Sequence, residues 1–429
     1  MSTLPYPPVA VVGSGPSGCF LAHALRRAWP LAPITVFDRL HTPFGLVRYG
    51  VSPDHQHSKN ITKQFDRAFT RDGIEFAGNI EIGKDISLEE LRRAYPIVVL
   101  ATGLSADRIL DIPGADLDGV YGAGRLTRVL NSHPDEADRL PRFGDDVVLI
   151  GSGNVAIDVV RFLVKTPEHF DGSDIDDELL SAYAQAPVRR INVISRSPLR
   201  SAKADAAMLR ELGRIPGVRF HASGDLALPP DADKVAASRV EALHALITAP
   251  APAEPTRVDV TFHFGFIPAE IRGEGHVREV ALTDASGQCT VVPADSVITA
   301  VGFTHAADSV TDGRSLELPD LESGRVAPGL YRTGWLRRGP RGTIPENRTD
   351  ALAVAAEIVA DFESGCVEHI DDRPGYSALP AHVDAQAVTY DDWRRIEAEE
   401  LAAAADGRIR RKLRDPSSLF TPTSPDPTN

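Results

Sequence analysis

VAVVGSGPSG, residues 9–18, is the stretch that constrains the fold of this chain most strongly. Its four apolar residues, Val9 to Val12, are typical of a buried parallel strand. The apolar periodicity from Phe20 to Trp29 then predicts a helix. A strand, a glycine-rich turn and a helix in this order predict a dinucleotide-binding unit.

The residues of this turn explain how a dinucleotide would bind. Gly13 permits a tight turn, Gly15 lets the backbone approach a pyrophosphate, and Gly18 lets helix and strand pack closely. The first N–H groups of the helix would face the anion. The next strand, Ile34 to Phe37, ends at Asp38, where a carboxylate accepts hydrogen bonds from a ribose hydroxyl. The predicted first site therefore contains Gly13, Gly15, Pro16, Ser17, Gly18 and Asp38.

A second unit of the same kind begins near residue 147. The apolar run Val147 to Ile150 leads into a G-x-G-x-x-A turn, and Ile157 to Lys165 has a helical pattern. The third position of this variant needs only a small side chain. The predicted second dinucleotide site contains Gly151, Gly153, Asn154, Val155 and Ala156.

Arg196 is the candidate that selects the second dinucleotide. The strand predicted over Val188 to Ile194 is followed by Ser195, Arg196 and Ser197, without the carboxylate that usually binds a free 2′-hydroxyl. A cation at this point suits a 2′-phosphate, which favours NADPH over NADH. The alternative is that Arg196 is a solvated surface charge.

Composition places the chain among folded globular proteins. Its 429 residues are enough for two domains, and 42% hydrophobic and 25% charged residues are ordinary values. No apolar run approaches membrane-spanning length, and residues 1–8 lack the pattern of a signal peptide, so we expect a cytoplasmic protein without a membrane partner. The net charge of −14 argues against general binding to nucleic acid.

The three cysteines have no functional spacing. Cys19, Cys289 and Cys366 form neither a C-x-x-C pair nor a metal-binding pattern. We therefore predict no metal site and no disulfide chemistry of the thioredoxin reductase kind, which needs paired cysteines. The three side chains are interpreted as small core residues.

Further apolar runs indicate parallel sheets covered on both faces. Ile97 to Leu100 is followed by Ala101-Thr102-Gly103, and Ser296 to Val301 has the same form. Alternating strands and helices with such runs predict an α/β fold.

With these features and two longer segments, the chain resembles the adrenodoxin reductase-like ferredoxin-NADP reductases. The segments are TPFGLVRYGV, residues 42–51, and GWLRRGPRGTI, residues 334–344, and the likeness runs from about Tyr6 to Gly365. The resemblance implies two Rossmann-like domains, with the NADPH domain inserted into the FAD domain near Asp107 and Leu318. The implied division is 1–106 and 319–365 for FAD and 107–318 for NADPH. Residues 366–429 extend past the family pattern, and the proline-rich composition of 415–429 predicts a C-terminal extension that is partly disordered or lies on the surface.

The resemblance also implies roles for individual residues. His55 and Glu211 match a pair near the flavin that handles hydride and proton, and Asp158 matches an acidic residue on the second helix. The loop from Gly334 to Ile344 resembles one that meets the flavin ring and the nicotinamide, and we expect an Ala-rich helix after it, over Asp350 to Phe362. Further residues implied in cofactor binding are Arg39, Gly45, Leu46, Val51, Ala101, Thr102, Gly103, Gly334, Trp335, Gly342, Thr343 and Ile344.

Two departures from the family pattern affect the choice of nicotinamide cofactor. Ser197 stands where a second arginine is usual, and Met208 stands where a glutamate is typical. Arg200 or Lys203 could replace the missing arginine, or NADH could serve as well as NADPH.

The function implied is electron transfer from NADPH through FAD to a ferredoxin or a similar small iron-sulfur carrier. One alternative is a flavin-dependent oxidase or monooxygenase that acts directly on a small molecule. Another is a flavin-containing binding protein without turnover, which the complete loop from Gly334 to Ile344 disfavours.

Overall fold

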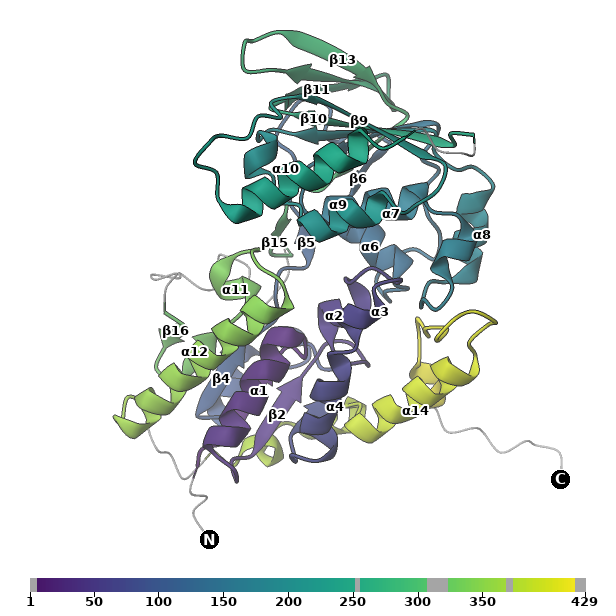
Figure 1. Cartoon of the computed structure of the whole chain (residues 1–429). Helices are drawn as coiled ribbons and strands as arrows, with labels where there is room; N and C mark the ends of the chain where they lie inside the picture. The colour runs from purple at the N-terminus through teal and green to yellow at the C-terminus, as the bar shows by residue number, and fades with distance from the viewer. Residues whose placement is uncertain (1–5, 251–254, 307–322, 368–372, 421–429) are drawn as a thin grey trace, which may run out of the picture.

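The first of two large sheets is built from both ends of the chain. The computed structural model describes residues 6–250, 255–306, 323–367 and 373–420. Figure 1 shows two lobes, one above the other, and this sheet lies in the lower one. Five of its strands are parallel, and only β16 runs antiparallel to its neighbour. In sheet order the strands are β16 (Arg325–Ala327), β17 (Leu330–Arg332), β4 (Ile97–Leu100), β1 (Val9–Val12), β2 (Ile34–Phe37) and β3 (Glu75–Ala77).

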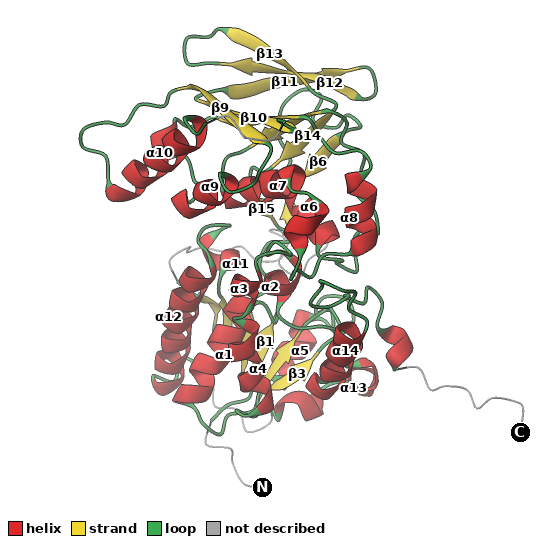
Figure 2. Ribbon diagram, turned by 45° about the vertical axis from the view of Figure 1, so that its right-hand side comes forward, coloured by secondary structure: helices red, strands yellow, loops and turns green. Residues whose placement is uncertain are grey.

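Helices cover both faces of this sheet (Figure 2). The helix α1 follows the first glycine turn and packs against α12. Strands β1, β2 and β4 are buried at every residue, which matches sequences that are apolar except for Thr35 in β2. The helices of this lobe before the C-terminal segment are α1 (Pro16–Ala28), α2 (Gly45–Tyr49), α3 (Gln56–Lys59), α4 (Thr62–Thr70), α5 (Leu88–Ala94), α11 (Trp335–Arg338) and α12 (Ile344–Glu363).

The second sheet is entirely parallel and lies in the upper lobe (Figure 1). Its strands in order are β6 (Val120–Gly122), β14 (Ser296–Thr299), β7 (Asp146–Ile150), β8 (Arg190–Ser195), β10 (Val258–Phe264) and β9 (Val218–Gly224). The antiparallel β11 (Ile267–Gly273), β12 (Val277–Thr283) and β13 (Cys289–Pro293) pack over it. The helices of this lobe are α6 (Ala123–Leu130), α7 (Asn154–Val164), η1 (Pro167–Phe170), α8 (Asp177–Ala184), η2 (Leu199–Ser201), α9 (Ala206–Leu212) and α10 (Lys234–Ile247).

All strands of the second sheet fall between β4 and β17 of the first in sequence, so the second unit is inserted into the first. This confirms the predicted α/β fold with two Rossmann-like units. Where the chain passes between the lobes, β5 (Ala106–Asp107) pairs antiparallel with β15 (Phe303–Thr304). The predicted boundary at Asp107 lies in this ladder, whereas the one near Leu318 lies outside the described residues.

The C-terminal segment is folded from residue 373 to residue 420. Trp393 on α14 is buried against Phe44 and the first core, and Phe420 stacks on His41 with ring centroids 6.3 Å apart. Residues 421–429 of the predicted disordered end lie outside the described residues. The elements of this segment are η3 (Gly375–Ala378), α13 (Ala381–Gln386), α14 (Tyr390–Ala402) and η4 (Ser417–Leu419).

Two details correct the sequence analysis. The helix expected over Asp350 to Phe362 begins at Ile344, because Thr343 and Glu346 form a capping box and Pro345 fits the first turn. Cys19 is buried as expected, and burial raises the pKa of its thiol. Cys289 and Cys366 are exposed, so the interpretation of all three as core residues is wrong for these two.

Across the described residues, the structure contains no helix long and apolar enough to cross a membrane.

Candidate functional site

The first glycine turn leaves open space in front of α1. A side chain at Gly13, which has φ of +110°, would place its Cβ 2.5 Å from the carbonyl oxygen of Ala101, and one at Gly18 would collide with the carbonyl of Gly13. At Gly15, by contrast, an added Cβ meets nothing within 4 Å. The N-terminus of α1 has no side-chain cap. Uncapped N–H groups beside unfilled space fit the pyrophosphate of FAD.

Asp38 contacts the turn itself. Its Oδ2 accepts hydrogen bonds from the backbone N and the hydroxyl of Ser14, and its Oδ1 accepts one from Leu40 N at 3.0 Å. The carboxylate therefore holds the glycine turn in place, and its contact with a ribose stays a prediction. Arg39 forms an ion pair with Asp135 of the upper lobe at 2.5 Å, so its role toward FAD also stays a prediction.

The segment around Gly45 lies against the glycine turn. Phe44 and Gly45 both have positive φ, +83° and +46°, and an added Cβ at Gly45 would lie 3.0 Å from the Cα of Gly15. The backbone then turns into α2, where the carbonyl of Leu46 accepts from the N–H of Val51 at 2.8 Å. This brings the predicted residue Gly45 beside the first site, with Leu46 next to it at the start of α2.

The loop before α12 is held by a buried carboxylate that the sequence analysis did not single out. Asp350 accepts hydrogen bonds from the Thr333 hydroxyl at 2.8 Å, from Gly334 N at 2.5 Å and from Arg337 Nε at 2.9 Å. Arg338 lies 3.1 Å from the same carboxylate. Because three donors and the Arg338 cation converge on one buried carboxylate, the Asp350 side chain holds the shape of the loop.

This loop connects the two predicted cofactor sites. A Cβ at Gly334 would collide with the hydroxyl of Ser17, so the loop lies directly against the first turn. The Trp335 ring stacks on Phe303 of β15, the strand where the chain leaves the upper lobe, with ring centroids 5.4 Å apart. The loop thus lies between the first site and the upper lobe.

The remaining residues predicted for the first site lie at two chain segments. Directly after β4, Ala101 is buried, Thr102 is exposed and Gly103 has positive φ. At the end of the loop, Gly342, Thr343 and Ile344 lead into α12.

The second glycine turn repeats the geometry of the first. A Cβ on Gly151 would collide with the carbonyl of Ala300, whereas one on Gly153 would meet only Lys203 at 3.8 Å. Asn154 opens α7, and its side chain exchanges hydrogen bonds with Asp205 at 2.7 and 2.9 Å. Ala156 is fully buried, as the small-residue position requires. The uncapped N-terminus of α7 fits a second pyrophosphate.

Arg196 follows β8 directly and is exposed. Among the described residues it has no ion-pair partner, so its guanidinium is available to a ligand. Arg200 differs because it pairs with Asp225 at 2.7 Å. Lys203 is exposed beside the second turn and remains the second candidate for a phosphate contact.

His55, Asp158 and Glu211 come together at the junction of the two lobes, whereas the family resemblance paired only His55 with Glu211. His55 Nδ1 lies 3.5 Å from Asp158 Oδ1, and its Nε2 lies 3.4 Å from Glu211 Oε2. His55 precedes α3 of the lower lobe, whereas Asp158 is on α7 and Glu211 on α9 of the upper lobe. An imidazole with a carboxylate at each nitrogen can hold or exchange a proton.

Three further charged residues complete this cluster, and sequence reasoning missed their roles. The buried Arg161 contacts Asp158 at 3.0 Å, Glu211 at 3.3 Å and Asp54 at 2.7 Å. Lys165 also pairs with Asp54. Burial alone would raise the pKa of Asp54, but Arg161 and Lys165 outweigh it and lower the pKa to about 2. Burial raises the pKa of Asp158, opposed by His55 and Arg161. The i, i+3 spacing of Asp158 and Arg161 was the available sequence signal.

The chain is similar to known oxidoreductases over most of its length. Residues 7–191 match the family model described as pyridine nucleotide-disulphide oxidoreductase. The chain is 43% identical to the cindoxin reductase of Citrobacter braakii over 418 residues, covering 96% of this chain and 90% of that protein. It is 31% identical to the mitochondrial NADPH:adrenodoxin oxidoreductase of Bos taurus, covering 96% of this chain and 91% of the relative.

Solved structures give the same result. FprA, an oxidoreductase of Mycobacterium tuberculosis, superposes with a TM-score of 0.85 at 30% identity and covers 96% of this chain and 98% of its own. One of its structures is a complex with NADPH and has the same score, identity and coverage. These relatives and both glycine turns establish that the chain belongs to the adrenodoxin reductase-like family of ferredoxin-NADP reductases.

Proposed function

We propose that this chain is a ferredoxin-NADP(+) reductase that binds FAD at the first glycine turn and NADPH at the second. The observation that supports this most is the loop from Gly334 to Ile344. It touches the first turn through Gly334 and Ser17 and reaches the upper lobe through Trp335 and Phe303. FAD, when bound, takes electrons in pairs from NADPH and passes them on one at a time.

The protein supplies placement and charge. The open space at Gly15 receives a pyrophosphate, and the N-terminus of α1 stabilises its negative charge. The N-terminus of α12 follows the loop that Asp350 holds, and the capping box of Thr343 and Glu346 fixes where the helix begins at the end of that loop.

His55 is the proposed proton-handling group. Its two ring nitrogens face Asp158 and Glu211, so a proton gained at either nitrogen is stabilised by a carboxylate. Arg161 is a positioning residue, because it contacts both carboxylates from a buried position on α7. The cluster therefore also fixes how the two lobes meet beside the site.

Arg196 is the proposed contact for the 2′-phosphate of NADPH. Its exposed guanidinium follows β8, on the strand next to the second glycine turn. Because only one arginine stands here, discrimination against NADH would rest on one or two charge-assisted contacts, from Arg196 and Lys203.

The assignments of domains and location are part of the same proposal. We propose the division at residues 106/107 and 318/319, with the extension from 366, and a cytoplasmic location. Limited proteolysis and cell fractionation test these two points.

Cytochrome c reduction tests the proposed acceptor. NADPH or NADH is supplied as reductant, with and without a small [2Fe–2S] ferredoxin. A ferredoxin reductase gives cytochrome c reduction that rises with ferredoxin concentration and is faster with NADPH. If ferredoxin has no effect while oxygen is consumed, the chain is instead an oxidase or monooxygenase.

A further inference from the structure

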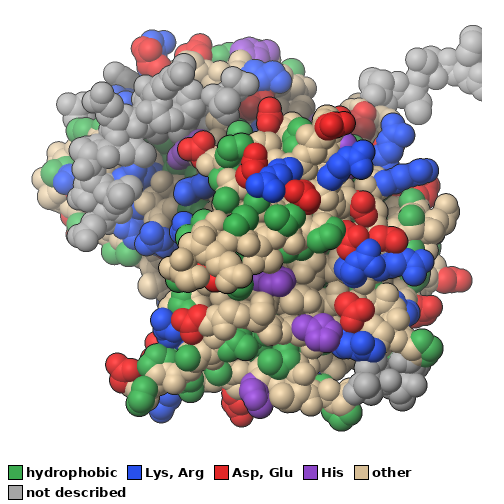
Figure 3. Space-filling model, turned by 90° about the horizontal axis from the view of Figure 1, so that it is seen from above, with side chains coloured by type: hydrophobic (Ala, Val, Ile, Leu, Met, Phe, Trp, Pro, Cys, Tyr) green, Lys and Arg blue, Asp and Glu red, His purple; other side chains and the backbone are tan. Residues whose placement is uncertain are grey.

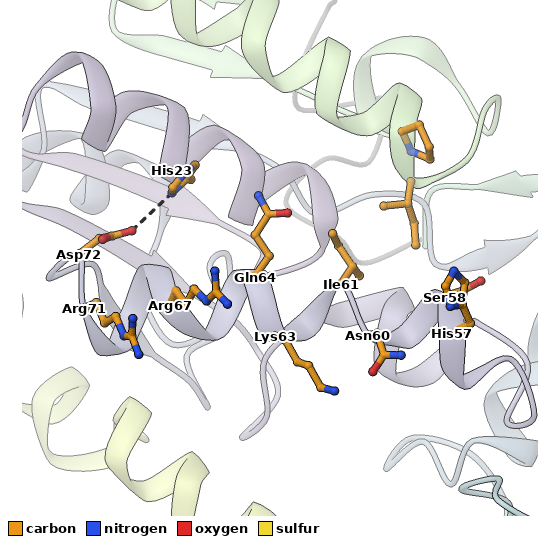
Figure 4. A pocket seen from close by; sticks show the side chains of 12 residues that line it. His23, His57, Ser58, Asn60, Ile61, Lys63, Gln64, Arg67, Arg71 and Asp72 are labelled. Atoms are coloured by element: carbon orange, nitrogen blue, oxygen red, sulfur yellow. Dashed lines mark ion pairs between the residues drawn. The ribbon is translucent and has the colours of Figure 1, made fainter.

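The short helix α3 is bonded to the upper lobe at both ends. His55 directly precedes it and contacts two carboxylates of the upper lobe. Lys59, its last residue, is buried, and its Nζ lies 2.8 Å from Asp174 Oδ1 of the upper lobe. The residues on either side of Lys59 differ, since Ser58 and Asn60 line an open groove (Figure 4). Lys59 therefore belongs to the junction of the lobes and not to this groove.

A second lysine reaches the same carboxylate from the C-terminal segment. Lys412 Nζ lies 3.0 Å from Asp174 Oδ2, and the Lys412 side chain is only 1% exposed. Both lysines also donate to the Oδ1 atom of Asn131, Lys59 at 2.7 Å and Lys412 at 2.9 Å. We refer to Lys59, Asn131, Asp174 and Lys412 as the Asp174 cluster. It joins α3, the upper lobe and the C-terminal segment, which are far apart in sequence.

The backbone around Lys412 is fixed to the lower lobe. Glu400 on α14 is fully buried, and its carboxylate pairs with Arg48 of α2. The Glu400 carbonyl accepts from Arg411 N at 2.9 Å, and its carboxylate accepts from Leu413 N at 2.9 Å. In Figure 1 the yellow chain after α14 lies between this helix and the upper lobe. Because both neighbours of Lys412 are held by the lower lobe, its ammonium connects that lobe to the upper one.

The two acceptors of the Asp174 cluster also hold the chain that leads to His55. Asn131 Nδ2 donates to the carbonyl of Val51 at 3.0 Å. Asp174 N donates to the carbonyl of Pro53 at 3.2 Å. Both carbonyls belong to the short stretch directly before His55. A displacement of Asn131 or Asp174 would therefore move the backbone that places the imidazole.

Lys412 is not needed to balance the charge of Asp174. Among the described residues, Asp174 is the one carboxylate that pairs with either lysine of the cluster, and Lys59 alone would neutralise it. Burial lowers the pKa of the Lys412 ammonium well below its usual value, although Asp174 opposes the shift. On the described part of the face in Figure 3, by contrast, basic and acidic side chains lie together at the surface. A second cation buried with one carboxylate costs free energy, so stabilisation of the fold does not explain its position.

We propose that Lys412 is a positioning residue for the reduction of bound flavin by NADPH. With Lys59 it fixes the two acceptors of the Asp174 cluster. Those acceptors hold the backbone that places His55 between its carboxylates. The inference rests on the proposed function, because it requires that His55 handles the proton. Since a small displacement of a reacting group slows a reaction strongly, the C-terminal segment contributes to this step from outside both glycine turns.

Anaerobic rapid mixing of the FAD-loaded protein with NADPH tests this role. The rate at which the absorbance of oxidised flavin disappears, measured over a range of NADPH concentrations, gives a limiting rate and an apparent Kd. Lys412→Met keeps a long side chain without the charge, and Lys59 still neutralises Asp174. We expect a limiting rate about fivefold lower, with the apparent Kd within about twofold of the wild-type value, because Arg196 and the second glycine turn are unchanged.

Arg411→Met is the matched control. Arg411 lies on the same segment, but its ion pair with Glu178 of the upper lobe is exposed, and exposed pairs contribute little. This variant should reduce at the wild-type rate. Urea unfolding compares stability, and Lys412→Met should unfold at no lower urea concentration than the wild type, because it removes an excess buried cation.

A wild-type limiting rate in Lys412→Met would make Lys412 an ordinary structural residue, whatever the stability of the variant, and the proposal would be wrong. If Lys412→Met does not fold, Lys412→Gln, which retains a donor for Asp174, is measured in its place and judged by the same limiting rate.

A double variant shows whether Lys412 acts through His55. In the His55→Gln background, Lys412→Met should slow the reduction by less than about twofold, since the group that it positions is already absent. Equal slowing in both backgrounds would mean that Lys412 acts by another route, and this would overturn the proposal.

The same measurements separate this inference from the proposed function. If His55→Gln is slow and Lys412→Met is not, the inference fails alone. If His55→Gln reduces at the wild-type rate, the proposed role of His55 fails and the inference fails with it. If NADPH does not reduce the flavin of the wild type, the proposed function itself is wrong.

Discussion

His55 Nε2 lies 3.4 Å from Glu211 Oε2, although 156 positions separate the two residues in the chain. The contact crosses from the lower lobe to the upper one, and Arg161 supports it by contacting Glu211 at 3.3 Å. A proton-handling group placed at this junction can respond to both proposed cofactor sites.

The variants His55→Gln and Glu211→Ala should each slow the reduction of bound flavin by NADPH by about tenfold, because each removes one half of a coupled acid-base pair. The double variant should lose less than the product of the two single losses. Rapid mixing with detection at about 450 nm, where oxidised flavin absorbs, measures the rates.

His57→Gln is the matched control for these two variants, since His57 is an exposed histidine two residues away on α3. It should reduce at the wild-type rate. If both His55→Gln and Glu211→Ala reduce flavin at the wild-type rate, the pair has no part in the mechanism. If His55→Gln lowers only the stability of the fold, His55 serves to pack the turn of Pro53 and Asp54.

Gly15→Glu should yield a folded protein without flavin. The open space at Gly15 accommodates a side chain, and its φ of −67° is ordinary for any residue. A carboxylate there would occupy the place proposed for the pyrophosphate and repel it. The absorbance ratio of flavin to protein after purification measures occupancy, with circular dichroism as the check on folding. Full occupancy in this variant would refute the first-site assignment.

Arg196→Ala should raise KM for NADPH by about one to two decades and leave KM for NADH nearly unchanged. One charge-assisted contact to a phosphate contributes roughly 1.5 to 3 kcal/mol. Arg200→Ala is the control, because Arg200 is already paired with Asp225. Equal effects of Arg196→Ala on both cofactors would mean that Arg196 supports the fold and does not read the 2′-phosphate.

Asp54 should make stability depend on pH in the acid range. Its pKa falls from 3.8 to about 2 in the folded protein. A lowered carboxyl pKa stabilises the fold above the unfolded pKa, and this stabilisation is lost as pH falls through the folded value. The loss between about pH 5 and about pH 2 is of the order of 2 kcal/mol.

The variant Asp54→Asn isolates this contribution. At neutral pH it should be less stable than the wild type, because the buried Arg161 and Lys165 lose their shared carboxylate. The stability difference, followed by urea unfolding, should shrink as pH is lowered toward 2. A difference that stays constant over this range would contradict the ion-pair interpretation.

The central strands and both turns were accessible from sequence. Strands β1, β2 and β4 have the predicted bounds because strands buried on both faces are nearly continuous apolar runs, and a proline precedes each of these three. The glycine motifs could also be read from sequence, and the structure gives the reason for three of the glycines: Gly13 and Gly151 approach the carbonyl after a neighbouring strand, and Gly18 approaches the carbonyl of Gly13. The meeting of His55 with Glu211 followed from family resemblance, because no local pattern brings them together.

Other parts of the site depend on tertiary contacts that a single sequence does not reveal. Asp350 is one acid among 60, and only the folded loop shows that Thr333 and Gly334 donate to it. In the C-terminal segment, Lys412 pairs with Asp174 at 3.0 Å and donates to Asn131 at 2.9 Å. A lysine in a polar, proline-rich tail looks solvated in sequence, whereas here it is buried between the lobes.

Sequential anaerobic mixing tests the proposed electron path most directly. The FAD-loaded protein is first mixed with NADPH, and the absorbance of oxidised flavin at about 450 nm is followed until it disappears. Oxidised [2Fe–2S] ferredoxin is then added without oxygen. We expect the absorbance of oxidised flavin to return at the same rate at which the ferredoxin becomes reduced. Bleaching by NADPH that ferredoxin leaves unchanged, and that only oxygen reverses, would contradict the proposed transfer to an iron-sulfur protein.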